Sequence, residues 1–353
     1  MFRKILALGG ISIAITFAQS KNAQSSTAAP NIPKDLFSHD VKVPPGYKAP
    51  KTSWGDPDLR GIWPINHLIR VGLTRPKQYD DRLYKTEEEF SGVAGGRGGR
   101  GGAGRGGRGG AVNETPPVAD SSDRKMWQTS LIVDPPDGQF PELTEYGKKL
   151  QAEMKGSYKP GQTVFDSVDD FAAWDRCITR GMPVSMEPRN YNNGIRIMQS
   201  PGYVVILLEM AHEARIIPIG KMPPLDSQIR EYLGESRGHW EGNTLVVETT
   251  NFNGLVGETS AGVPGSPRPL EPESPNMKIV ERFTRVAPDT IEFRMTISDP
   301  TVLATGSYTV AYPMFLDNKY LQFEYACHEG NMAIRGYIEN SRYEREHPKE
   351  PKK

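Results

Sequence analysis

The stretch KIVERFTRVAPDTIEFRMTIS, from Lys278 to Ser298, provides the clearest indication of the fold class. In its second half, polar residues alternate with a regular apolar set formed by Ile291, Phe293, Met295 and Ile297. A period of two predicts a β-strand with one buried face. The turn-forming sequence Ala287-Pro288-Asp289 separates this strand from an earlier one, so the stretch predicts an antiparallel hairpin.

Further short strands are expected on both sides of this hairpin. Their predicted ranges are Ile195–Gln199, Tyr203–Ile219, Thr244–Phe252, Ser307–Tyr312 and Leu321–Cys327. Seven or more short antiparallel strands predict a mainly β protein, built as an antiparallel β-barrel or a sandwich and lipocalin-like. A closed barrel with a central cavity is the favoured form. One or two short helices are expected in the N-terminal part, at Tyr84–Phe90 and Leu143–Met154.

The first 25 residues have the pattern of a signal peptide. Arg3 and Lys4 precede the apolar run from Ile5 to Ala18, and small residues follow it. The run is shorter than the roughly 20 apolar residues that a membrane span needs, and no later segment is suitable. The sequence therefore predicts an exported protein, periplasmic or secreted, without an integral membrane segment.

The predicted domain organisation has five parts. After the signal peptide (1–25) come a flexible lead-in (26–57), a single β-rich domain (58–342) and a disordered tail (343–353). A glycine- and arginine-rich segment (92–111) interrupts the domain and is interpreted as a disordered loop, although such segments also bind RNA. The chain has 43 basic and 43 acidic side chains, and this balance argues against a nucleic-acid partner. The oligomeric state stays open.

The chain has two cysteines, Cys177 and Cys327. In an oxidising compartment they form the only possible intramolecular disulfide, which would bring their Cα atoms to about 5.5–6 Å. The bond would gather the polar segments DRCITRG and EYACHEGN at one place. We therefore expect the functional site beside it.

The segment LLEMAHEARII supplies most of the catalytic candidates: Glu209, His212, Glu213 and Arg215. Charged groups between strongly apolar residues are rarely buried without a partner. In a regular strand the two glutamates and the arginine share one face, and a bulge near Ala211 would bring His212 onto it. The functional interpretation is a carboxylate–imidazole pair that moves protons. The alternative is a structural ion pair with the histidine at the surface.

His328, directly after Cys327, is the fifth catalytic candidate, as a general base or as a hydrogen-bonded rim residue. A divalent metal shared by His212, His328 and Glu209 is conceivable, but the spacing gives no specific support for it. The expectation is therefore a protein without metal or organic cofactor.

Seven further residues are candidates for contacting a small-molecule substrate or ligand. Arginine side chains suit a carboxylate, and tyrosine, tryptophan and asparagine suit a polar aromatic pocket. Each also has a structural interpretation, as a salt bridge, a turn or packing at the end of the barrel. The set is Arg176, Arg180, Tyr191, Asn192, His239, Trp240 and Tyr325.

Several stretches between Asp58 and Arg342 resemble a large family of exported bacterial proteins of unassigned function. They are DLRGIW, TSLIVDPPDG, DRCITRG, QSPGYVVILLEMAHEARIIP, RGHWEGNTLVVETTNF, ERFTRV and EYACHEGN. The resemblance implies no reaction. Relatives often have His-Asp where this chain has His212-Glu213, so a carboxylate is kept. They also often have a histidine in the loop that here runs from Gly220 to Pro224, so that histidine is not essential to a shared reaction.

Two functions from different classes follow from these residues. The first is an exported, cofactor-independent enzyme that performs acid–base chemistry, as a lyase, isomerase or hydrolase, on a small and partly apolar metabolite. The second is a lipocalin-like small-molecule binding protein of the periplasm without catalysis. Convergence of the catalytic candidates in a concave pocket would favour the enzyme.

Overall fold

The computed structural model describes residues 43–86, 89, 128–256, 266, 268 and 270–348. The predicted signal peptide (1–25) and the glycine–arginine loop (92–111) lie outside the described residues.

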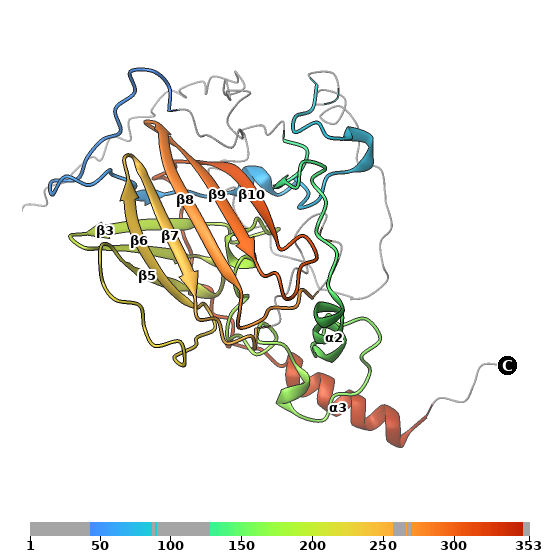
Figure 1. Ribbon diagram of the computed structural model, residues 1–353. Helices are drawn as coiled ribbons and strands as arrows, with labels where there is room; N and C mark the ends of the chain where they lie inside the picture. Colours follow the sequence, from blue (N-terminus) through green and yellow to red (C-terminus); the bar gives the residue numbers. More distant parts are fainter. Residues whose placement is uncertain are drawn as a thin grey trace, which may run out of the picture.

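Two antiparallel sheets form the body of the described protein (Figure 1). The four-stranded sheet has the order β1 (Gly61–Ile62), β3 (Ile195–Ser200), β4 (Tyr203–Leu208) and β5 (Ala214–Pro218). The six-stranded sheet has the order β2 (Ile132–Asp134), β10 (Ser307–Phe315), β9 (Thr290–Ser298), β8 (Lys278–Ala287), β7 (Thr244–Thr250) and β6 (Glu235–Glu241). The predicted hairpin from Lys278 to Ser298 is confirmed as β8 and β9, with a register shift between Arg285 and Ala287.

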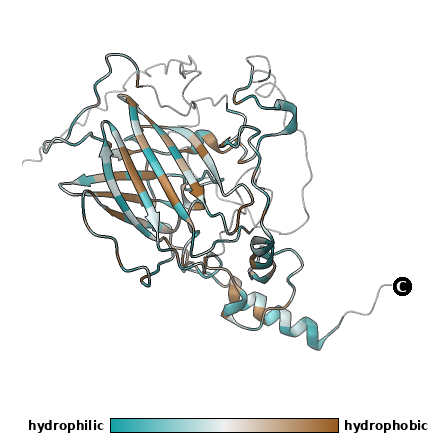
Figure 2. Ribbon diagram, in the orientation of Figure 1, coloured by the Kyte–Doolittle hydropathy of each residue, from teal (hydrophilic) through white to brown (hydrophobic). Residues whose placement is uncertain are grey.

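The sheets pack on each other with an apolar layer between them, and they are not closed into a barrel. Side chains from both sheets, such as Ile206, Ile217, Phe283 and Phe293, are buried in this layer. Brown bands of apolar residues therefore alternate with polar ones along the strands (Figure 2). A single parallel bridge, Ile219 with Gly238, links edge strand β5 to edge strand β6. The mainly β prediction is confirmed, but the favoured closed barrel is not what forms.

In the part of the chain that the structure describes, two α-helices lie at one end of the sheets (Figure 1). Helix α2 (Glu145–Glu153) confirms the predicted helix, and Thr144 caps it by accepting a hydrogen bond from the Gly147 backbone N–H at 3.0 Å. The apolar side of this helix is only partly buried, since Tyr146 is 48% exposed. The long helix α3 (Ala333–Glu346) was not expected. Short 3₁₀ turns complete the elements: η1 (Asn66–Leu68), η2 (Lys77–Tyr79), η4 (Val168–Asp170), η5 (Val184–Met186) and η6 (Met210–His212).

The structure differs from the sequence-based expectations at both ends of the chain. Residues 43–57, within the predicted flexible lead-in, form turns and a bridge between Lys51 and Pro57. Residues 343–346 of the predicted disordered tail belong to α3, and the segment from Leu321 to Cys327 contains no strand. In the described ranges, no helix combines the length and apolar character needed to cross a bilayer.

The predicted strand from Tyr203 to Ile219 is instead a hairpin of β4 and β5. The chain reverses at Glu209–Glu213, where Ala211 and His212 take φ values of 58° and 44°. This left-handed backbone makes a tight turn rather than a bulge. The charged residues that were expected to share one face of a strand therefore lie on both sides of this turn.

Candidate functional site

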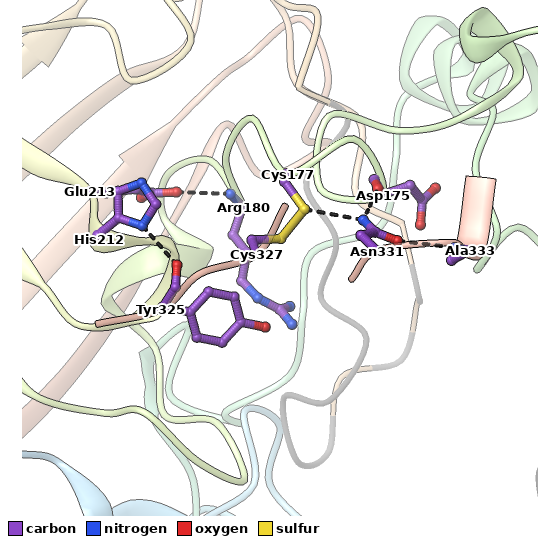
Figure 3. The surroundings of a disulfide bond; sticks show 9 residues. All are labelled: Asp175, Cys177, Arg180, His212, Glu213, Tyr325, Cys327, Asn331 and Ala333. Atoms are coloured by element: carbon purple, nitrogen blue, oxygen red, sulfur yellow. Dashed lines mark hydrogen bonds between the residues drawn. A yellow bond between two sulfur atoms is a disulfide. The ribbon is translucent and has the colours of Figure 1, made fainter. Parts of the chain in front are cut away.

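The disulfide between Cys177 and Cys327 is present, with a Cα–Cα distance of 5.6 Å (Figure 3). It joins the loop before η5 to the irregular segment that leads into α3. Asn331 donates a hydrogen bond to the Cys177 sulfur at 3.2 Å. The predicted gathering of the two cysteine motifs is confirmed.

Glu213 fixes the loop on the Cys177 side. Its carboxylate is buried and accepts hydrogen bonds from the Thr179 hydroxyl (2.6 Å), the Arg180 backbone N–H (3.0 Å) and the Ser185 hydroxyl (2.7 Å). Three donors compensate the desolvation of a buried carboxylate. Glu213 therefore positions Arg180 rather than facing an open site.

Glu209 fixes the segment on the Cys327 side of the disulfide in the same way. It accepts hydrogen bonds from the Gly194 backbone N–H (2.9 Å), the Tyr320 hydroxyl (2.6 Å) and the Phe323 backbone N–H (3.0 Å). A Cβ on residue 194 would lie only 2.7 Å from the Glu209 carboxylate, so glycine is needed for this close approach. Glu209 thus ties β3 to the C-terminal segment.

Arg215 lies in the apolar layer between the sheets, away from the disulfide. It forms a two-pronged ion pair with Glu281 on β8, and it donates to the hydroxyls of Ser236 (3.1 Å) and Thr249 (3.2 Å). Both charged side chains are almost completely buried. This pair connects the two sheets.

The two histidine candidates are exposed. The Nδ1 atom of His212 lies 2.8 Å from the Tyr325 carbonyl oxygen, so it holds the segment that carries Tyr325 (Figure 3). His328 does not line the open cavity that lies beside the disulfide. The five catalytic candidates therefore do not converge in one pocket.

An open cavity of about 680 Å³ lies beside the disulfide. Four of the seven predicted ligand-contacting residues line it: Arg180, Tyr191, Asn192 and Tyr325. Both cysteines line it as well. Its other walls come from the segments around α2, η5 and α3, namely Ser157, Tyr158, Trp174, Asp175, Glu324, Ala326, Glu329, Gly330, Asn331, Ala333 and Tyr337.

The cavity combines aromatic rings and one desolvated cation, Arg180, with the carboxylates of Asp175, Glu324 and Glu329. The Arg180 guanidinium lies 3.8 Å from the centre of the Trp174 ring, and burial lowers the pKa of Arg180. The Tyr325 ring is nearly parallel to that of Tyr191, with 6.4 Å between centres. Burial and a hydrogen bond with Tyr191 raise the pKa of Tyr325, so its hydroxyl keeps its proton at neutral pH.

The remaining predicted contacts lie elsewhere. His239 is on the exposed face of β6, with its Nε2 atom 3.2 Å from the Glu241 carboxylate. Trp240 packs against the apolar layer between the sheets, rather than at the end of a barrel. Arg176 is half-buried and is not among the residues that line the cavity.

Sequence reasoning missed three aromatic residues of the cavity. Trp174 lies three residues before Cys177, and this proximity was the one signal that could have identified it. Tyr158 and Tyr337 reach the cavity from the segment after α2 and from α3. The described residues contain no cluster of three or more His, Cys, Asp or Glu side chains that could hold a metal ion.

No protein-family model, no curated protein and no solved structure matches this chain.

Proposed function

We propose that this protein is an exported binding protein for a small aromatic carboxylate, which it holds in the disulfide-linked cavity. The observation that carries the proposal is the combination of the Arg180 cation with Trp174, Tyr191 and Tyr325 in one open cavity. A flat ring stacks on tyrosine, and a carboxylate complements a guanidinium. The volume of about 680 Å³ lies in the usual range for small-molecule sites.

Three observations support the exported location. The Cys177–Cys327 disulfide is compatible with an oxidising compartment. The first residues have the composition of a signal peptide, and the motifs resemble an exported bacterial family. We propose membership in that family on the same motifs.

Binding is favoured over acid–base catalysis because the buried acidic candidates already have several hydrogen-bond donors each. Glu209 and Glu213 each accept three hydrogen bonds from their own chain. A carboxylate held in this way positions the backbone and has little freedom to accept a proton from a ligand.

An enzyme at the same cavity is the second candidate, because the Tyr191–Tyr325 pair lies beside Arg180. In that case the protonated Tyr325 hydroxyl would donate a proton to the substrate, and Arg180 would stabilise developing negative charge. Tyr325→Phe would then abolish turnover while it leaves ligand binding nearly unchanged. Product analysis with the purified protein and a set of aromatic acids distinguishes this candidate from simple binding.

Calorimetric titration with benzoate and 4-hydroxybenzoate tests the binding proposal. We expect saturable binding that benzyl alcohol and cyclohexanecarboxylate do not reproduce, because each lacks one of the two recognised features. Tyr191 is 53% exposed, so Tyr191→Ala should fold normally. It should weaken binding roughly fivefold through the loss of stacking.

Tyr146→Ala is the matched control, since Tyr146 is 48% exposed and does not line the cavity. It should leave the affinity unchanged. If no aromatic acid binds below about 1 mM, or if Tyr191→Ala and Tyr146→Ala behave alike, the proposal is wrong.

A further inference from the structure

The charged side chains that line the disulfide-linked cavity do not balance one another. Among the described residues of its wall, Arg180 is the one cation, whereas Asp175, Glu324 and Glu329 are carboxylates. Three carboxylates against one guanidinium leave an excess of negative charge at neutral pH. A cavity with an excess of one sign attracts ions of the opposite sign and repels ions of its own sign.

Asp175 has a structural role that explains its place in the wall. Its Oδ2 atom accepts hydrogen bonds from the backbone N–H groups of Ser157 (2.9 Å) and Ala172 (3.1 Å), and its Oδ1 atom accepts one from the Ser157 hydroxyl (2.5 Å). These donors hold the carboxylate to its own chain. The negative charges that the fold leaves unexplained are therefore those of Glu324 and Glu329.

The carboxylates of Glu324 and Glu329 have no hydrogen-bond or ion-pair partner among the described residues. Both side chains are exposed, so they lie at the rim of the cavity. Glu324 directly precedes Tyr325, whose carbonyl oxygen is held by His212, and Glu329 follows Cys327 by two residues (Figure 3). The histidine contact and the disulfide thus keep the segment that carries both carboxylates beside the cavity.

Two further tyrosine rings lie at the same cavity. Tyr158 is 45% exposed and Tyr337 is 43% exposed, and both line the wall. The face of an aromatic ring is negative and attracts an organic ammonium group. No cluster of side chains in the described ranges could hold a metal ion. Exposed rings together with two carboxylates therefore favour an ammonium group as the cation that complements this rim.

We propose that the ligand of this cavity carries an ammonium group in addition to its aromatic ring and its carboxylate. This inference rests on the proposed function, because Arg180 still receives the carboxylate. Glu324 and Glu329 receive the ammonium group at the rim. Arg180 is only 6% exposed whereas both glutamates are exposed, so the two charged groups of the ligand lie at opposite ends of its ring. The cavity of about 680 Å³ is large enough for such a ligand.

A matched pair of probes isolates the contribution of the ammonium group. The amine of 4-(aminomethyl)benzoate is protonated at neutral pH, and 4-ethylbenzoate has nearly the same shape without this charge. In calorimetric titrations of the purified protein at low salt, we expect a dissociation constant at least about fivefold lower for 4-(aminomethyl)benzoate. The difference should shrink in about 0.5 M salt, because the rim carboxylates are exposed and are screened.

Replacement of the two rim carboxylates should reverse this preference. Glu324→Gln/Glu329→Gln should weaken the binding of 4-(aminomethyl)benzoate by at least about fivefold, and it should not weaken the binding of 4-ethylbenzoate. Glu142→Gln/Glu346→Gln is the matched control, since both side chains are exposed and do not line the cavity. This control removes the same charge and should change neither affinity.

The outcomes separate this inference from the proposed function. If the wild-type protein binds 4-ethylbenzoate at least as tightly as 4-(aminomethyl)benzoate, or if the two double variants behave alike, there is no ammonium site and the site for an aromatic carboxylate stands. If neither probe binds below about 1 mM, the proposed function is wrong and this inference falls with it.

Discussion

At the scale of single residues, the acidic side chains between β4 and β5 are hydrogen-bond centres that hold other segments in place. Glu209 and Glu213 follow each other closely in sequence, but the turn between them points one at the C-terminal segment and the other at the loop after Cys177. The acidic residues in an apolar segment are buried as expected, but neutral hydrogen-bond donors rather than cations satisfy both carboxylates. The identity of the partners was not predictable, because the donors to Glu213 lie 28 to 34 positions away in the sequence and those to Glu209 lie up to 114 positions away.

Replacement of Glu213 by alanine should destabilise the protein strongly. The Thr179 and Ser185 hydroxyls and the Arg180 N–H would lose their acceptor in a buried place, at a cost of about 3 kcal/mol or more. Urea unfolding measures the loss. Glu248→Ala is the control, because this half-exposed surface ion pair should contribute below about 1 kcal/mol. A Glu213→Ala protein of normal stability that fails to act on its ligand would instead point to a catalytic role.

Glu187 should make stability depend on pH. Complete burial raises the pKa of Glu187 to about 7, and its Oε2 atom has no hydrogen-bond partner among the described residues. The folded protein therefore retains a proton that the unfolded chain releases near its ordinary pKa of 4.5. The contribution of Glu187 to the free energy of unfolding is therefore fully present below about pH 4.5. It is lost as the pH rises to about 7, and the loss is roughly 3 kcal/mol.

Burial also raises the pKa values of Glu271 and Glu273, each to about 8, and these groups add to the same trend. Urea unfolding midpoints between pH 5 and 8 measure this slope, and Glu187→Gln should flatten it, because glutamine stays neutral in both states. Glu248→Gln should leave the slope unchanged. A slope that rises with pH, or one that Glu187→Gln does not alter, would contradict this role of Glu187.

At the scale of elements, the local sequence pattern was sufficient to predict the strands of a hairpin, but it did not predict the sharp turn between β4 and β5. Alternation over Lys278–Ser298 predicts β8 and β9 because a sheet face needs every second residue. The turn at Ala211–His212 places an alanine at positive φ, which alanine seldom adopts, so the sequence gives little indication of it. Helix α3 was missed because its charged sequence presents only a narrow buried side, where Ser341 accepts a hydrogen bond from the Phe165 N–H at 2.9 Å.

The disulfide should be required for ligand binding, because it joins the two elements that carry Arg180 and Tyr325. It closes a loop of 150 residues, and its loss should lower stability by up to roughly 5 kcal/mol in the chain-entropy description. Titration of 4-hydroxybenzoate before and after dithiothreitol should show at least about a tenfold loss of affinity. The Cys177→Ser/Cys327→Ser protein should bind as weakly as the reduced protein and should not respond to the reductant. Equal affinity for 4-hydroxybenzoate in both redox states would show that ligand binding does not depend on the disulfide.

At the scale of the whole molecule, one buried ion pair connects the two sheets. Arg215→Met should cost about 3–5 kcal/mol, because it leaves the Glu281 carboxylate charged and unpaired in the apolar layer. Addition of Glu281→Leu should recover most of this loss, since an apolar pair suits the same layer. Urea unfolding of the two single variants and the double variant forms the required cycle. A double variant as unstable as Arg215→Met alone would show that the pair is not an isolated contact between the sheets.

The global arrangement limits what a single sequence can reveal about the site. The β class followed from local patterning and the disulfide from having two cysteines, and the disulfide lies beside the cavity proposed as the site. The export signal stays a prediction. Arg180, Tyr191, Asn192 and Tyr325 were found because they are near a cysteine or in a polar motif. Tyr158 and Tyr337 were not, because they reach the cavity from the segment after α2 and from α3, where Tyr337 packs against Phe165.

Fluorine NMR of the protein labelled with 3-fluorotyrosine locates the ligand most directly. Tyr→Phe variants assign the resonances of Tyr191, Tyr325 and the control Tyr146. On titration with 4-hydroxybenzoate, the signals of Tyr191 and Tyr325 should move together and saturate, while that of Tyr146 stays fixed. Saturable binding that leaves Tyr191 and Tyr325 unmoved would show that the cavity beside Cys177–Cys327 is not the binding site.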